Sequence, residues 1–244
     1  MARFDREARR AGFAMTWWDI KYLHMTIQWL GQSCFKIITK GVGNAEIVVV
    51  TDPYSNEVGL RLPKLSADII TVSHDHFDHN NYGDIKGNLD AAPFLIKEEG
   101  EYETKGVFVQ SVATFHDDKS GADRAKNIVY IFHVDDIVVA HLGDLGHELT
   151  AEQVEEIGDV DILLVPVGGK YTLDAKGAAE VVKQLEPRIV IPMHYHVPGL
   201  KVDIAGDEAF LKLFGNKFET MKKMKVSKKD LMAEETRVIV LERE

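Results

Sequence analysis

The chain has 244 residues, enough for one large domain or two tightly fused half-domains. Its hydrophobic fraction of 45% is ordinary for a globular protein and excludes a disordered chain. The formal net charge of -10 argues against sequence-independent nucleic-acid binding as the main activity. No apolar run reaches the roughly 20 residues of a membrane span, so we expect no membrane partner.

The N-terminus and the cysteine content suggest a cellular compartment. Cys34 is the only cysteine, so no intrachain disulfide can form, and we expect a cytoplasmic protein. Residues 1–24 precede the regular pattern; they are either an amphipathic docking helix or the product of an upstream start codon. They mix Asp5 and Glu7 with arginines and lack an apolar run, so a secretory signal is not expected.

Predicted strands dominate the first half of the chain after these residues. Short β-branched runs predict strands at residues 25–30, 34–39, 46–51, 67–72, 93–97, 106–114, 127–133 and 137–142. Glycines separate the first three, and Val134-Asp135-Asp136 predicts a hairpin turn between the last two.

Strands alternate with helices in the second half. Thr150 and Gln153 predict a capping box at the start of a helix. A strand at 161–167, a helix at 174–185, a strand at 188–193, a helix at 207–214 and a strand at 237–241 follow. The lysines between Lys222 and Lys229 are expected on a solvated helix face. We therefore expect one mixed α/β (α+β) domain, residues 25–244, with two sheets sandwiched between helices.

The segment His74-Asp75-His76-Phe77-Asp78-His79 follows the predicted strand at 67–72. Alternate side chains of an extended segment point the same way, so His74 and His76 should share one cavity, and Asp78 and His79 can face it from the turn. Three imidazoles and a carboxylate are ligands that Zn²⁺ favours. The segment therefore predicts a metal site.

Three further ligand-type residues follow other predicted strands. His116 follows the strand at 106–114, Asp144 the strand at 137–142, and His194 the strand at 188–193. Open α/β sheets place ligands at the carboxyl ends of their strands. These residues are therefore candidates to complete a site for two metal ions.

These motifs resemble the metallo-β-lactamase-fold superfamily of metal-dependent hydrolases. The resemblance rests on residues 31–35 (Gly-Gln-Ser-Cys-Phe), 51–53, 74–79, 141–146, 165–169 and 191–195, and it extends from residue 25 to the C-terminus. The chain is most similar to the small stand-alone prokaryotic members related to ascorbate-phosphate lactonase. The fold this implies is a four-layer αββα sandwich with metals at one edge. Asn80-Asn81 departs from the glycine that many relatives have after the motif.

The resemblance also implies roles for the candidate ligands. His74, His76 and His116 would hold the first metal, and Asp78, His79 and His194 the second, with Asp144 bridging both. Asp52 would support the site from behind the ligands. Two divalent ions are implied, Zn²⁺ first and Mn²⁺ as an alternative.

The chemistry expected from such a site is hydrolysis. With Asp78, Asp144 and a bridging hydroxide, two divalent ions leave a core of about +1, which suits an anionic substrate or an oxyanion. Asp78 is the candidate catalytic carboxylate, placed to orient the hydroxide or pass on its proton. We expect cleavage of an ester-like bond, such as a lactone or phosphoester, in a small anionic metabolite.

Two other functions remain as alternatives. Relatives with the same ligands cut RNA or DNA, so a nuclease or phosphodiesterase is the first alternative, although the net charge is against it. A metal-free, non-catalytic scaffold is the second. The candidate substrate contacts are His147, Lys170, Tyr171 and His196, which lie on loops near proposed ligands. The sequence leaves open whether the chain forms a homo-oligomer.

Overall fold

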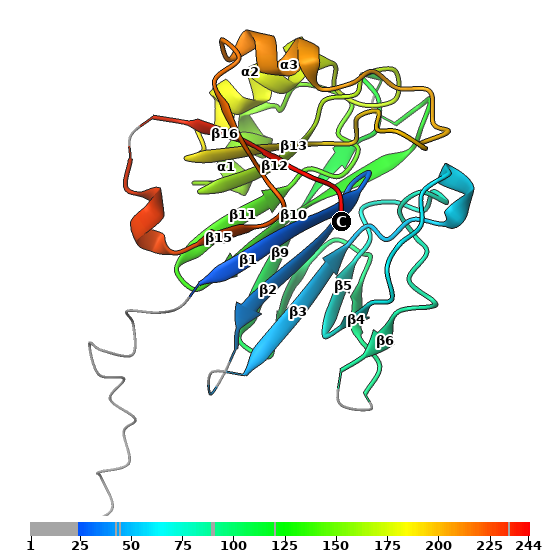
Figure 1. Ribbon diagram of the computed structural model, residues 1–244, viewed down its shortest axis with the longest axis vertical. Helices are drawn as coiled ribbons and strands as arrows, with labels where there is room; N and C mark the ends of the chain where they lie inside the picture. Colours follow the sequence, from blue (N-terminus) through cyan, green and yellow to red (C-terminus); the bar gives the residue numbers. More distant parts are fainter. Residues whose placement is uncertain (1–23, 42, 44, 89–90, 120, 234) are drawn as a thin grey trace, which may run out of the picture.

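Two β-sheets packed face to face form the body of the protein in the computed structural model (Figure 1). The structure describes residues 24–41, 43, 45–88, 91–119, 121–233 and 235–244. Apart from residue 24, the expected N-terminal extension at 1–24 lies outside the described residues.

The first sheet has six strands. Five come from the N-terminal half of the chain, and one comes from near its C-terminal end. Their order is β15 (Met224–Val226), β1 (Met25–Gly31), β2 (Cys34–Lys40), β3 (Glu46–Thr51), β5 (Ile69–Thr71) and β7 (Phe94–Ile96). Neighbours from β15 to β3 pair antiparallel, whereas β3, β5 and β7 are parallel.

The second sheet has eight strands and changes from antiparallel to parallel pairing at β11. Their order is β14 (Phe218–Met221), β16 (Arg237–Leu241), β13 (Ile189–Met193), β12 (Ile162–Pro166), β11 (Ile137–His141), β10 (Lys126–Val134), β9 (Val107–Phe115) and β8 (Glu101–Thr104). Strands β11, β12 and β13 run parallel, so their carboxyl ends meet at one edge.

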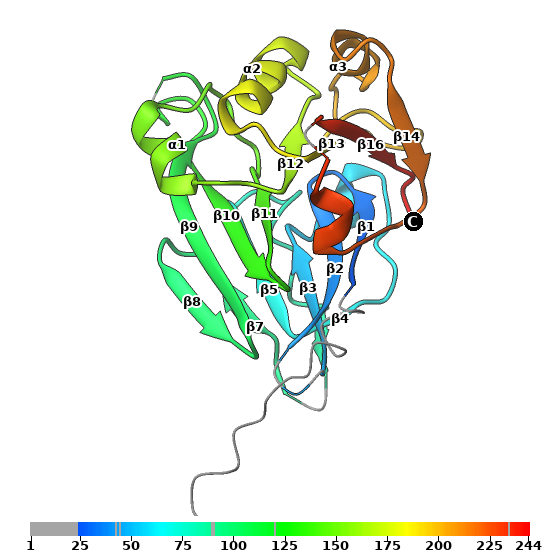
Figure 2. The ribbon, with the colours of Figure 1, turned by 90° about the vertical axis from the view of Figure 1, so that its left-hand side faces the viewer.

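Three α-helices cover the outer face of the eight-stranded sheet (Figure 2). They are α1 (Ala151–Ile157), α2 (Ala175–Leu185) and α3 (Glu208–Leu213). Thr150 caps α1 through the expected capping box with Gln153, and α2 turns Val181, Val182 and Leu185 into the core. No helix among the described residues is long and apolar enough to cross a bilayer.

Loops cover the outer face of the six-stranded sheet among the described residues. Tyr54, Val58 and Leu60, from the loop after β3, pack with Ile85 and Leu200 on this face. The loop contains only a short 3-10 helix, η3 (Asn56–Val58), because Pro53, Gly59 and Pro63 interrupt any longer helix. The predicted sandwich is confirmed, and in the part of the chain that the structure describes its outer layer on this side is formed by loops.

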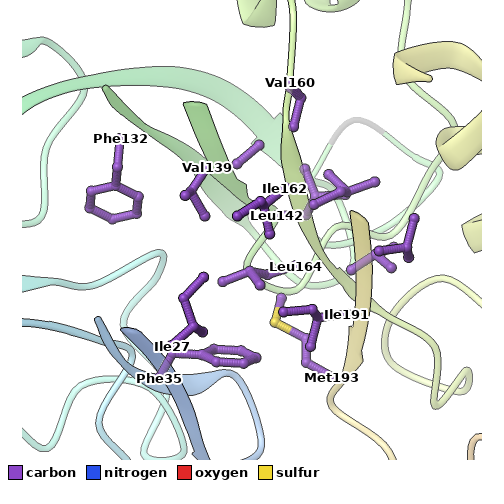
Figure 3. Close-up of a cluster of buried hydrophobic side chains, with 14 of the residues drawn as sticks. Ile27, Phe35, Phe132, Val139, Leu142, Val160, Ile162, Leu164, Ile191 and Met193 are labelled. Atoms are coloured by element: carbon purple, nitrogen blue, oxygen red, sulfur yellow. The ribbon is translucent and has the colours of Figure 1, made fainter. Parts of the chain in front are cut away.

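The main hydrophobic core fills the space between the two sheets (Figure 3). Ile27 and Phe35 project from the six-stranded sheet toward Val139, Leu164 and Ile191 of the eight-stranded sheet. Alternate residues of the same strands, such as Leu30 and Cys34, face the opposite way into the loop-covered layer. This packing fixes the relative position of the two sheets and of the strand ends that carry the candidate ligands.

Two sequence-based predictions are wrong in detail. The strand expected at 67–72 is divided into β4 (Ser66–Ala67) and β5, because the buried carboxylate of Asp68 accepts hydrogen bonds from Val48 N and Asn88 Nδ2. Strand β4 instead pairs with the short β6 (Lys86–Gly87).

The lysine segment is not a helix face. Its burial alternates over Met224, Lys225 and Val226, which form β15, and a 3-10 helix, η4 (Lys228–Leu231), follows. Lys228 pairs with Asp161 at the start of β12, with Nζ 2.8 Å from Oδ2. Strands β8 and β14 were also not predicted.

Candidate metal centre

Seven ligand-type side chains converge at one edge of the sandwich. Four lie in the segment after β5, and the others directly follow β9, β11 and β13. The structure places them in two groups, His74, His76 and His116 in one and Asp78, His79, Asp144 and His194 in the other. Within each group the candidate ligand atoms lie within 4.8 Å of one another. The sequence therefore identified a set of residues that the fold brings together.

The carboxylate of Asp144 lies between the two groups. Its Oδ2 is 3.2 Å from His79 Nε2, 3.3 Å from His116 Nε2 and 3.3 Å from His194 Nε2. His74 Nε2 is 4.0 Å from the same oxygen. This oxygen is thus shared by imidazoles of both groups, as a bridging position requires.

Two of the imidazoles are fixed at one nitrogen and open at the other. His74 Nδ1 lies 3.0 Å from Ser73 Oγ, and His79 Nδ1 lies 2.9 Å from Asp52 Oδ2. Their Nε2 atoms are buried and form no well-directed hydrogen bond among the described residues, although His79 Nε2 lies 3.2 Å from the Asp144 carboxylate. Buried polar atoms are normally satisfied, and a ligand histidine normally uses its second nitrogen for such a support. The donor set therefore fits divalent metal ions.

Asp52 holds the ligand segment from behind. It is fully buried, its Oδ1 accepts from Ser73 N at 2.7 Å, and its Oδ2 accepts from Ser73 Oγ at 2.6 Å and faces His79. The residue has a φ of 39°, in the left-handed region, so the chain turns sharply at this strand end. One carboxylate thus orients both the backbone before the ligand segment and an imidazole within it.

Asn127 fixes the segment that carries Asp144, a role that sequence reasoning missed. Its Oδ1 accepts from Asp144 N at 2.9 Å, and its Nδ2 donates to Leu142 O at 2.9 Å and Thr114 Oγ1 at 2.7 Å. Gly143 has a φ of 55°, and a Cβ there would lie 2.4 Å from Asn127 Oδ1, so this turn requires glycine. The available signal in the sequence was an amide side chain at the start of a predicted strand that is otherwise mostly apolar.

The carboxylates and imidazoles strongly shift the pKa values of one another. Burial opposes charge on His79, but Asp144 and Asp78 outweigh it and raise the pKa of this imidazole well above its usual value. Burial, together with the positive potential of His79, lowers the pKa of His74 well below its usual value. Burial also opposes charge on Asp144, yet His194 and His79 hold its pKa well below the usual range. The carboxylates therefore favour positive charge beside them.

An open cavity of about 670 Å³ lies over the two groups. Its wall includes His76, Asp78, His116, Asp144 and His194, together with the side chains Glu57, Phe77, Asp123, Arg124, Tyr171, Lys201, Val202 and Asp203. In Figure 1 the loop after β3 and the loop after β13 face each other at the right-hand edge, and Lys201 N donates to Val58 O between them at 2.8 Å. A larger cavity near Asp161 contains none of the candidate ligands.

Of the four predicted substrate contacts, only Tyr171 lines this cavity. Lys170 forms an ion pair with Asp203, and His196 is exposed outside the lining. His147 is bound to backbone, with Nε2 accepting from Phe115 N at 3.2 Å and Nδ1 2.7 Å from Glu148 O. Arg124 and Lys201 also line the cavity, and neither was selected from the sequence.

Comparisons with known proteins agree with this architecture. The profile of the family described as "Beta-lactamase superfamily domain" matches residues 26–194. A UPF0173 metal-dependent hydrolase of Thermococcus onnurineus is 31% identical over 80% of this chain and 94% of its own length. A second, from Thermoplasma acidophilum, is 33% identical over 71% of this chain and 84% of its own.

A solved structure gives the same result. It comes from Thermotoga maritima and is described as a member of the metallo-β-lactamase superfamily, and it is 38% identical with a TM-score of 0.72. The match covers 90% of this chain and 100% of that one. By its fold, its matched residues and its relatives, the chain belongs to the metallo-β-lactamase superfamily, among relatives of the UPF0173 metal-dependent hydrolases.

Proposed function

We propose that this metal-dependent hydrolase uses two metal ions to cleave an ester-like bond, such as a lactone or phosphoester, in a small anionic molecule. The observation that carries the proposal is the shared position of Asp144. One of its oxygens lies within 4.0 Å of the open nitrogen of His74 and 3.2 Å from that of His79, which belong to different groups. A site for a single metal ion needs only one such group of ligand-type side chains.

The ligand assignment follows the two groups. His74, His76 and His116 would hold one ion, Asp78, His79 and His194 the other, with Asp144 between them. An imidazole-rich set with two carboxylates favours Zn²⁺, and Mn²⁺ is the alternative that the carboxylates allow. Bound divalent ions would lower the pKa of water to about 7 and stabilise negative charge on a reacting oxygen.

Asp78 is the proposed catalytic carboxylate. It lines the cavity, and its Oδ2 lies 3.6 Å from His79 Nε2 and 3.8 Å from His194 Nε2. Burial opposes its charge, but His79 and His194 outweigh burial and hold its pKa well below the usual range. An ionised carboxylate at this place accepts the hydrogen bond of an attacking water and orients it.

The surroundings support a small anionic substrate. The cavity volume of about 670 Å³ lies within the range of small-molecule sites. Two carboxylates against two divalent ions leave a core of about +2 before any anion binds. Because Cys34 is a buried free thiol and no other cysteine exists, we place this activity in the cytoplasm.

A nuclease is the less favoured alternative. The lysine segment from Lys222 to Lys229 does not contribute to the cavity lining, and Lys228 is paired with Asp161. Binding of single-stranded RNA that survives moderate salt would favour the nuclease over the small-molecule hydrolase.

Metal analysis tests the proposed centre directly. We expect about two divalent ions per chain after gentle purification, and none in the double variant His76→Ala/Asp144→Ala. A content below one ion per chain in the unaltered protein would favour the non-catalytic scaffold instead.

An activity screen tests the reaction class. The metal-loaded protein is assayed against lactones, phosphodiesters, phosphomonoesters and thioesters, with the same double variant as the blank. Hydrolysis in at least one class by the unaltered protein and none by the variant supports the proposal. Activity that persists in the variant would contradict the assignment of the reaction to this centre.

A further inference from the structure

Arg124 presents an unpaired positive charge at the wall of the cavity. Its guanidinium carbon lies 5.5 Å from the centroid of the Tyr171 ring, and its Nη1 donates to Tyr171 O at 3.5 Å. No carboxylate forms an ion pair with this guanidinium in the part of the chain that the structure describes. Contact with an aromatic face restrains a guanidinium while leaving most of its N–H groups free to bind an anion.

The backbone that carries Arg124 is fixed by one buried carboxylate. Asp117 directly follows a candidate ligand, and only 4% of it is exposed. Its oxygens accept from four backbone N–H groups, those of Lys119 at 2.8 Å, Gly121 at 2.9 Å, Asp123 at 3.0 Å and Arg124 at 2.7 Å. The loop is therefore held in shape before any ligand arrives, which reduces the entropic cost of binding.

The charged side chains of the rim leave a net positive charge. Apart from the metal cluster, the cavity is lined by the charged residues Glu57, Asp123, Arg124, Lys201 and Asp203. Two of the carboxylates are neutralised by lysines, Asp123 by Lys119 and Asp203 by Lys170. Neither Lys201 nor Glu57 forms an ion pair among the described residues, so these two and Arg124 are the unpaired charges of the rim. The rim has an excess of one positive charge, additional to that of any bound metal.

The remaining lining is apolar. Phe77 is 49% exposed at the cavity although it lies within the ligand segment, and Val202 and the ring of Tyr171 add further apolar surface. An exposed phenylalanine beside a polar cluster indicates contact with an apolar part of a ligand.

We infer that Arg124, with Lys201, binds a carboxylate or phosphate group of the substrate that is separate from the bond being hydrolysed. This rests on the proposed function. The substrate is then an ester whose apolar portion lies against Phe77 and Tyr171 and whose second, anionic group pairs with the guanidinium. Arg124 is a specificity-determining residue, and Asp117 is a positioning residue that acts through it.

A binding experiment tests the subsite without catalysis. Phenylphosphonate, which has an aryl ring and an anionic group but no scissile ester, is titrated into metal-free protein by calorimetry. Arg124→Gln is expected to weaken binding at least tenfold and Arg124→Lys less, because lysine keeps the charge but not the planar fork. Lys126→Gln is the matched control, since Lys126 pairs with Glu99 and does not line this cavity. Equal affinity in Arg124→Gln and the unaltered protein would overturn the inference.

A kinetic experiment tests its meaning for the substrate. Metal-loaded enzyme is assayed with mono-4-nitrophenyl glutarate and with 4-nitrophenyl butyrate, two esters that differ in a remote carboxylate. The ratio of kcat/KM for the glutarate over the butyrate is expected to fall at least tenfold in Arg124→Gln, mainly through KM, and to stay constant in Lys126→Gln. An unchanged ratio in Arg124→Gln would contradict the subsite. Hydrolysis of neither ester would count against the proposed function alone, because the binding experiment still decides the subsite.

Discussion

Replacing Asn127 by leucine should test how strongly one buried amide holds the segment of Asp144. The change removes three hydrogen bonds and keeps the number and branching of the side-chain heavy atoms. Leu142 O keeps a bond from Leu145 N at 3.2 Å, whereas Asp144 N has no other partner among the described residues. One orphaned buried N–H costs about 1–3 kcal/mol, and each of the two other lost bonds contributes about 1 kcal/mol.

The expected loss of stability is therefore about 3–5 kcal/mol. For a chain of this size that lowers Tm by about 6–20 °C. Thermal and urea unfolding of metal-free protein measures it, so that lost metal binding does not contribute. Asn81→Leu is the matched control, because it removes a single half-buried bond to Tyr54 O, 3.2 Å long, and should cost less than about 1 kcal/mol. If Asn127→Leu unfolds within about 0.5 kcal/mol of the unaltered protein, the amide does not hold this segment.

Three further predictions concern other parts of the structure. Asp52→Asn removes the negative charge beside His79 Nδ1 and replaces one of the two acceptor oxygens by an NH2 donor. It should weaken metal binding about 10–100-fold in a chelator competition, with unchanged affinity as the contradicting result. Burial opposes charge on Asp68, but hydrogen bonds from the Lys105 ammonium and other groups lower the pKa of this carboxyl. The contribution of Asp68 to stability is therefore present above the usual aspartate pKa and is lost as pH falls. The difference in unfolding free energy between the unaltered protein and Asp68→Asn should therefore shrink from pH 7 to pH 3, and a constant difference would refute this. Gly143→Ala should lower Tm, because its methyl group would lie 2.4 Å from a buried amide oxygen, and a Tm equal to that of the unaltered protein would show that the turn adapts.

Short sequence patterns were sufficient to predict those parts of the structure that depend on contacts between residues close together in the chain. The capping box of Thr150 with Gln153 and the hairpin turn at Asp135-Asp136, whose φ angles are 52° and 60°, are confirmed. The strand expected at 67–72 is divided at Asp68 because distant residues supply that carboxylate with partners. Such partners are absent from any short window of sequence.

The residues of the candidate site also fall into those that the sequence predicts and those that it does not. His116, Asp144 and His194 were selected because a ligand-type residue stood at the end of a strand, and the fold brings them together. Asn127 and Arg124 act through contacts with residues of other strands and loops, so their positions along the chain carry no comparable signal. His147 and His196 lie near ligands in sequence, yet outside the cavity lining.

The density of ligands in residues 74–79 has a consequence for folding. Four of the seven candidate ligands lie in this short segment, so an unfolded chain already offers much of one coordination shell. Metal that binds the unfolded chain stabilises the unfolded state. The net gain in unfolding free energy from metal is therefore smaller than the affinity of the folded site would imply. The other three ligands join only when the two sheets have packed, which requires contacts between distant parts of the chain. Refolding should accordingly give more active protein when metal is added after the sheets have formed than when it is present from the start.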